Sequence, residues 1–251
     1  MNGDWTEDAR LLLARAKLHL AELHRIIGDT DHELFSIDET KNENGTYTYA
    51  VVVNSGRLKM AKPVAADVAN NLVHTLDQAV GALARLRGHD RNRDIYFPWS
   101  LDDANFRASL NRLEPFIGTE AVDHVLEARE RNRTRLPHAQ MVKEVSNSGK
   151  HWSLIPSNAT VRAVAVNRPG QGQKIWDVRD DDLEDGHYPF LNSDVPMTGV
   201  PFQLLVGIRF SGVDPLVAAS PDMIFDQTLH FVEDMVVTLC GPDVGQDELG
   251  L

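Results

Sequence analysis

The segment Pro63–Arg87, PVAADVANNLVHTLDQAVGALARLR, decides the fold of this 251-residue chain. Its apolar residues recur three and four positions apart, which is the spacing of one face of an α-helix. They are Val64, Val68, Leu72, Leu76, Ala79, Leu83 and Leu86. Because proline suits the first turn of a helix, we expect the helix to begin at Pro63. A helix of this length with an apolar face is predicted to lie at the centre of the hydrophobic core.

Other segments on both sides of this helix predict a helix-rich chain. Ser100 and Asp103 have the spacing of a capping box, and we expect the helix that they start to end before Pro115. Pro221 opens a last helix that runs through Leu239. The predicted helices are 6–27, 63–87, 100–114, about 120–131, about 138–148 and 221–239.

Strands are expected in two parts of the chain. Asn44-Gly45 is the favoured pair of a tight hairpin turn, and it lies between the β-prone stretches 34–37 and 46–53. From residue 152 to about residue 212, short β-prone stretches alternate with Gly and Pro. These stretches are 152–155, 161–166, 174–178 and 203–210.

This order of elements predicts an α+β fold. It has an N-terminal helix and β-hairpin, a long central helix with further helices, and a C-terminal antiparallel sheet closed by a helix. We expect one domain over residues 1–240, with a helical part at about 1–150 and a sheet part at about 151–240. Residues 241–251 are predicted to form an acidic tail.

The composition argues against several classes of protein. Hydrophobic residues make up 42% and charged residues 25%, which is typical of a globular chain. No apolar run approaches the roughly 20 residues of a membrane span, and the acidic N-terminus lacks a signal-peptide core, so we expect a soluble, cytoplasmic protein with no membrane partner. The single cysteine, Cys240, rules out an internal disulfide framework. The net charge of −12 disfavours a nucleic-acid partner, because phosphates are repelled at long range.

Positive charge is nevertheless concentrated locally. Arg129, Arg131, Arg133 and Arg135 follow one another with only Glu130 opposing them. Stabilisation of helix C-termini explains such a cluster without a function, and a phosphate-bearing partner is the alternative.

A row of polar side chains follows one face of the predicted central helix and borders its apolar stripe. It consists of Asp67, Asn70, Asn71, His74, Asp77 and Gln78. A carboxylate one turn from a histidine, as Asp77 is from His74, can orient the imidazole and raise its basicity. The row therefore has two interpretations: hydrogen bonds that hold neighbouring helices, or an acid–base site.

A second polar segment, Asn147-Ser-Gly-Lys-His-Trp152, lies where a predicted helix ends and the first strand of the sheet begins. Gly149 can end the helix, and Lys150 and His151 then lie beside the last carbonyl groups, where cations are favoured. The functional interpretation pairs Lys150 or His151 with Asp77 across the core.

Both polar segments resemble motifs of a widespread, uncharacterised bacterial protein family. Asp67–Ala79, DVANNLVHTLDQA, is similar to the family motif G-D-x-x-H-N-L-R-S-A-L-D-H, and Asn147–Trp152 is similar to N-x-D-K-H-R. Phe97-Pro98 resembles the family's F-P-I element, and the likeness runs over most of the chain. The positions that carry over are Asp67, Asn71, Leu72, Leu76, Asp77, Asn147, Lys150 and His151.

Several charged positions of the family motifs are replaced in this chain. Asn70, Val73 and Gln78 stand where the family has His, Arg and His, and Gly149 and Trp152 stand where it has Asp and Arg. The family motif R-S-A-L-D-H also resembles the R-x(4–6)-H signature of HEPN ribonucleases, which cleave RNA without a metal. The replacements imply that a catalytic site of either kind would be degenerate here.

The leading hypothesis from the sequence is a binding protein without chemistry of its own, and no cofactor or metal is predicted. Its partner would be another protein or a small anionic ligand. The hypothesis leaves open whether the chain also forms a homo-oligomer. Asp67, Asn71 and Asn147 are the candidate binding residues. The alternative is a degenerate HEPN-like ribonuclease or phosphodiesterase, with His74, Asp77, Lys150 and His151 as its candidate catalytic residues.

Overall fold

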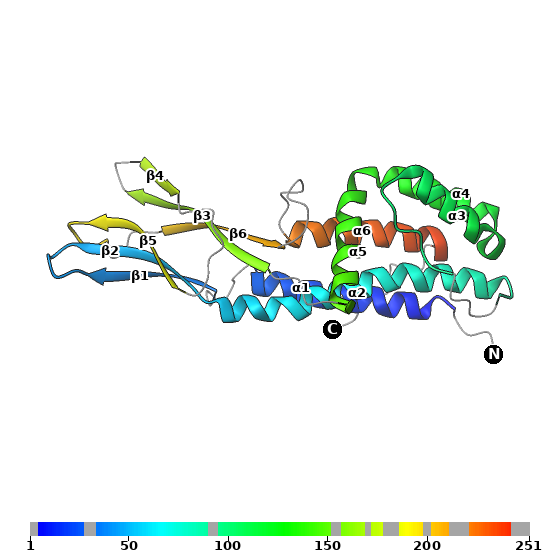
Figure 1. Ribbon diagram of the computed structural model, residues 1–251, viewed down its shortest axis with the longest axis horizontal. Helices are drawn as coiled ribbons and strands as arrows, with labels where there is room; N and C mark the ends of the chain where they lie inside the picture. The colour runs from blue at the N-terminus through cyan, green and yellow to red at the C-terminus, as the bar shows by residue number, and fades with distance from the viewer. Residues whose placement is uncertain are drawn as a thin grey trace.

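The computed structural model describes residues 5–27, 34–89, 95–151, 157–168, 172–177, 186–197, 202–210 and 221–241. Over these residues the fold is α+β, as predicted. The molecule is elongated, with the helices gathered at one end and the strands at the other (Figure 1).

The helical end is built around the long helix α2. The α-helices are α1 (Glu7–Ile27), α2 (Ser55–Leu86), α3 (Asp103–Ile117), α4 (Thr119–Arg131), α5 (Leu136–His151) and α6 (Pro221–Cys240), and a 3-10 turn, η1 (Arg133–Arg135), precedes α5. α2 packs against α1 along its length and contacts α5 and α6, so it occupies the central position that its apolar stripe predicted (Figure 1).

In the described part of the chain, the strands form two three-stranded antiparallel sheets. They are β1 (Phe35–Lys41), β2 (Tyr47–Val53), β3 (Ser157–Arg168), β4 (Gly172–Asp177), β5 (Gly186–Ser193) and β6 (Phe202–Phe210). The strand orders are β1-β2-β5 and β4-β3-β6. The predicted hairpin is therefore present, and it is extended by β5 from the C-terminal half of the chain.

The main hydrophobic core lies in the helical end. Leu72 and Leu76 of α2 and Val232 of α6 are completely buried in it. The buried side chains described on β1 and β2, such as Phe35 and Val51, are not among the described members of this cluster. The core that supports α2 is thus made of helices and of the short segment that carries Phe97.

Both predicted proline boundaries are wrong. α2 begins at Ser55, so Pro63 lies inside it, and Pro115 lies inside α3. Each proline removes one hydrogen bond to the carbonyl four residues earlier, and both prolines are exposed, so water can satisfy that carbonyl. The helix that was expected to start at Ser100 begins at Asp103, because Asp102 is the N-cap and accepts a hydrogen bond from the Asn105 N–H at 2.7 Å.

Other sequence predictions at the strand end need correction. β5 was not predicted, because its central Pro189 is typical of a loop; β5 accommodates it as an outer strand of its sheet. The predicted helix end at Gly149 is wrong, since α5 continues to His151. The predicted strand 152–155 lies outside the described residues, and the division into one domain and a tail stays a prediction.

Candidate functional site

The predicted polar row lies on α2, and its members differ in exposure. Asp67 is exposed, whereas Asn70, Asn71, His74, Asp77 and Gln78 are half-buried. The positions that would carry charge in the resembled family motif diverge here: Val73 is completely buried in the core, and Gln78 lies at a pocket.

The polar row meets α5, but through a residue that the sequence analysis did not select. Ser146, which is completely buried, donates a hydrogen bond from Oγ to Asn70 Oδ1 at 2.8 Å. Asn147 is exposed beside it. Lys150 and His151 lie in the last turn of α5, and their side chains fall outside the described part of the structure, so their pairing with Asp77 stays a prediction.

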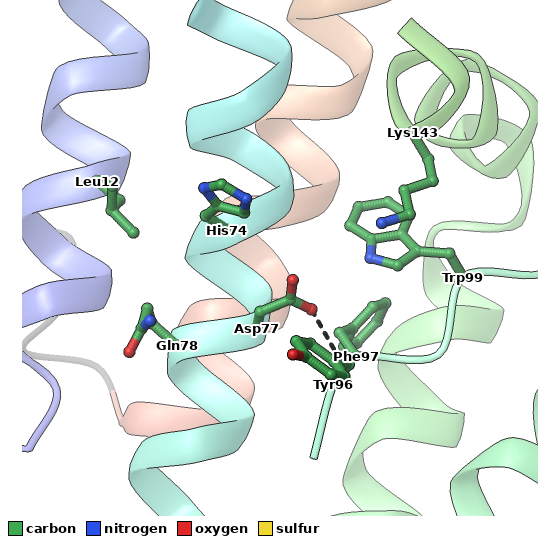
Figure 2. A pocket seen from close by; sticks show the side chains of 8 residues that line it. All are labelled: Leu12, His74, Asp77, Gln78, Tyr96, Phe97, Trp99 and Lys143. Carbon is green, nitrogen blue, oxygen red and sulfur yellow. Dashed lines mark hydrogen bonds between the residues drawn. The ribbon is translucent and has the colours of Figure 1, made fainter. Parts of the chain in front are cut away.

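A pocket of about 750 Å³ opens beside the polar row. We call it the α2 pocket (Figure 2). Its lining comes from α1, α2, α5 and the extended segment before α3, and consists of Leu12, His74, Asp77, Gln78, Tyr96, Phe97, Trp99 and Lys143. Three of the six residues of the predicted polar row therefore lie together at one cavity.

Asp77 fixes one side of the α2 pocket. Its Oδ1 accepts a hydrogen bond from the Phe97 backbone N–H at 3.0 Å. The other carboxylate oxygen points toward the space between His74 and Trp99 (Figure 2). Asp77 thus attaches the aromatic segment to the middle of α2 and also contributes an acceptor to the pocket.

The opposite side of the pocket is aromatic and basic. The Trp99 ring lies edge-on to Phe97, at 5.3 Å between ring centres, and is tilted against Phe231 at 6.1 Å. The Lys143 ammonium lies 5.9 Å from the centre of the Trp99 ring. Trp99 Nε1 is buried and has no hydrogen-bond acceptor among the described residues. This side therefore combines a cationic group with a buried N–H that lacks an acceptor within the described ranges.

The arginine cluster forms structural contacts between α3, α4 and α6. Arg129 is only 6% exposed; it donates to Ser100 O, Leu101 O and Asp103 Oδ1, each at 2.9 Å, and its guanidinium stacks over the Phe106 ring. Arg133 pairs with Asp103 and Glu130. The hydrogen bond from Arg129 and the charge of Arg133 lower the pKa of Asp103 below its ordinary value. Arg129 and Arg133, which could have contributed to a phosphate site, are therefore already paired with other groups of the protein.

Two searches of the described residues bear on the remaining classes of site. They contain no helix that combines the length and hydrophobicity of a membrane span. In the same part of the chain, no three His, Cys, Asp or Glu side chains come together in a way that could hold a metal ion.

Comparisons with known proteins give no further guidance. A scan against protein-family models found no match, and neither a search of curated proteins nor a search of solved structures found a similar chain. The resemblance to the bacterial family therefore stays a prediction.

Half of the pocket lining was not selected from the sequence. Leu12, Tyr96, Trp99 and Lys143 come from three separate segments, and only packing brings them to α2. One signal was present in the sequence: Tyr96, Phe97 and Trp99 are crowded into the short segment between the predicted helices 63–87 and 100–114.

Proposed function

We propose that this protein binds a small molecule in the α2 pocket and carries out no chemistry on it. The observation that carries the proposal is the pocket itself. Its volume of about 750 Å³ lies within the roughly 300–1,000 Å³ of typical small-molecule sites. Its lining combines apolar and aromatic side chains with polar and charged ones, and polar groups of this kind can orient a ligand.

The anchoring of the polar residues supports binding. Asp77 is engaged with the Phe97 backbone, and Asn70 is engaged with Ser146. Such contacts hold the pocket walls in place before a ligand arrives, and a preorganised site loses less entropy on binding. The proposal keeps the small-ligand partner expected from the sequence.

The test is a screen of small fragments of mixed charge, observed through the Trp99 indole N–H signal in a two-dimensional nitrogen–proton spectrum. The Trp99→Phe variant identifies that signal. We expect some fragments to shift it in a saturable way, and we expect Gln78→Phe, which fills the pocket, to abolish the shift. Asp67→Phe is the matched control, because Asp67 is exposed on the same helix face and does not line the pocket. The absence of any saturable shift would refute the proposal.

The degenerate phosphodiesterase or ribonuclease is kept as a rival, because His74 and Asp77 both line the pocket. Incubation with single-stranded RNA and with bis(4-nitrophenyl) phosphate separates the two functions. The binding proposal expects equal background rates for the parent and for His74→Ala. Hydrolysis by the parent that His74→Ala abolishes would favour the enzyme.

A further inference from the structure

We propose that the ligand of the α2 pocket is a small aromatic carboxylate, with its acid group held by the Lys143 ammonium and the Trp99 indole N–H. This inference rests on the small-molecule function proposed above and adds the class of ligand.

Trp99 carries a buried hydrogen-bond donor without an acceptor in the described part of the chain. A buried N–H without an acceptor is unfavourable, and such groups are rare in folded proteins. Trp99 Nε1 is in this state among the described residues. Figure 2 shows the indole nitrogen on the edge of the ring that faces α2, beside the Lys143 ammonium. Because this nitrogen is buried, neighbouring side chains have to move before a ligand oxygen can accept from it.

A cation lies next to that donor. The Lys143 ammonium lies over the same indole, 5.9 Å from its centre. A carboxylate has two oxygens, so one can accept from Lys143 and the other from Trp99. Hydrogen bonds between charged partners are stronger than those between neutral groups, which favours an ionised acid over an ester or an amide.

The aromatic and apolar side chains of the pocket favour an aromatic body for the ligand. Tyr96 is 56% exposed at the pocket, and Leu12 contributes apolar surface from α1. Phe97 and Phe231 hold the Trp99 ring edge-on or tilted, so the aromatic wall is rigid. Flat rings gain contact area and edge-to-face interactions against such a wall.

The carboxylate in the pocket lining restricts the charge of the ligand. The Asp77 carboxylate faces the same space from α2, and the chain as a whole carries −12. A dianionic phosphate would be repelled more strongly than a monoanionic carboxylate. The acid group is therefore expected on the α5 side of the pocket, away from Asp77.

The experiment compares three probes by titration calorimetry and by the Trp99 indole signal: benzoate, its uncharged counterpart benzamide, and the non-aromatic cyclohexanecarboxylate. Benzoate is expected to bind at least about tenfold more tightly than benzamide and to move the indole proton downfield. Cyclohexanecarboxylate is expected to bind more weakly than benzoate.

Two lysine variants locate the acid group. Lys143→Met keeps the aliphatic stem and removes the charge, and we expect it to weaken benzoate binding about tenfold and benzamide binding much less, because the neutral amide accepts a weaker hydrogen bond. Lys41→Met is the matched control, because Lys41 lies over the Tyr47 ring at a similar 5.8 Å and does not line the pocket. It should leave both affinities unchanged.

Equal affinities for benzoate and benzamide in the unaltered protein would overturn the aromatic-acid assignment, whether or not the variants fold. So would benzoate binding that Lys143→Met does not weaken. If only neutral or cationic fragments bind and Gln78→Phe blocks them, the ligand class is wrong and the small-molecule function stands. If no fragment binds, both proposals fail.

Discussion

At the scale of single residues, Asp77 joins the middle of α2 to the backbone of Phe97. Removing its carboxylate by Asp77→Ala leaves the Phe97 N–H without its acceptor, so we expect a loss of about 1–3 kcal/mol in the free energy of unfolding. Asp77→Asn keeps an amide oxygen in the same place and should cost less. Urea denaturation followed by circular dichroism measures both.

The control for Asp77 is Asp67, which is exposed on the same face of α2. Asp67→Ala should change the stability by no more than about 0.5 kcal/mol. Equal losses at the two positions would mean that the contact with Phe97 contributes nothing.

Gly118 connects α3 to α4 with a backbone that suits glycine alone. Its φ of 84° and ψ of 157° lie in a region that other residues almost never occupy. We expect Gly118→Ala to destabilise the protein by about 1–3 kcal/mol, as measured by thermal or urea unfolding. An added Cβ would also meet the Arg87 guanidinium, but that exposed side chain can move away. The loss should therefore persist when Arg87→Ala is added; recovery of stability would instead identify the collision as the cause.

The sequence predicted some of the residues at the candidate site and not others, for a physical reason. His74, Asp77 and Gln78 share a face because of helical geometry alone, which is a local property. Trp99 and Lys143 reach the pocket through the packing of α5 and the segment before α3 against α2, and no local pattern encodes that packing. The same holds for Ser146, whose partner Asn70 is 76 positions away.

At the scale of elements, Arg129 of α4 holds the start of α3. Arg129→Met should cost about 2–3 kcal/mol, because two backbone carbonyls and Asp103 lose a charged donor. Arg133 also binds Asp103 but is exposed, so Arg133→Met should have a much smaller effect. Similar losses for the two variants in urea denaturation would contradict the assigned role of the buried arginine.

The same contact has a pH signature. Because the pKa of Asp103 is lowered in the folded protein, its contribution to stability is present above its unfolded pKa of about 3.9 and is lost as the pH falls through the folded value. A carboxyl-detected titration should show the pKa of Asp103 moving toward its ordinary value in Arg129→Met. An unchanged pKa would show that Arg129 does not cause the shift.

The types of elements were predicted better than their boundaries. Each of the six predicted helices corresponds to an α-helix in the described part of the chain, and Asn44-Gly45 identified the hairpin. The two helix boundaries predicted at Pro63 and Pro115 were wrong. Both prolines lie on exposed helix faces, where a missing hydrogen bond is tolerated. β5 was missed because it gains its strand character from pairing with β2, which is distant in sequence.

At the scale of the whole molecule, the core and the hairpin occupy opposite ends (Figure 1). The buried side chains of β1 and β2 do not join the helical core cluster, so we expect this end to open without global unfolding. Native-state hydrogen exchange should show β2 amides exchanging at lower denaturant concentrations than amides of α2 near Leu76. Equal opening free energies for the β2 amides and the α2 amides would show that the two ends of the molecule unfold together.

The pairing of β2 with β5 has a consequence for how the chain acquires its fold. Tyr47 pairs with Ser193, and α2 to α5 lie between them in the sequence. Closing so long a loop in an unstructured chain is entropically unfavourable, and contacts between distant segments form slowly. Once the helices between them in the sequence are assembled, β2 and β5 are already held near each other before they pair. We expect pulse-labelling during refolding to protect α2 first and the amides that link β2 to β5 last.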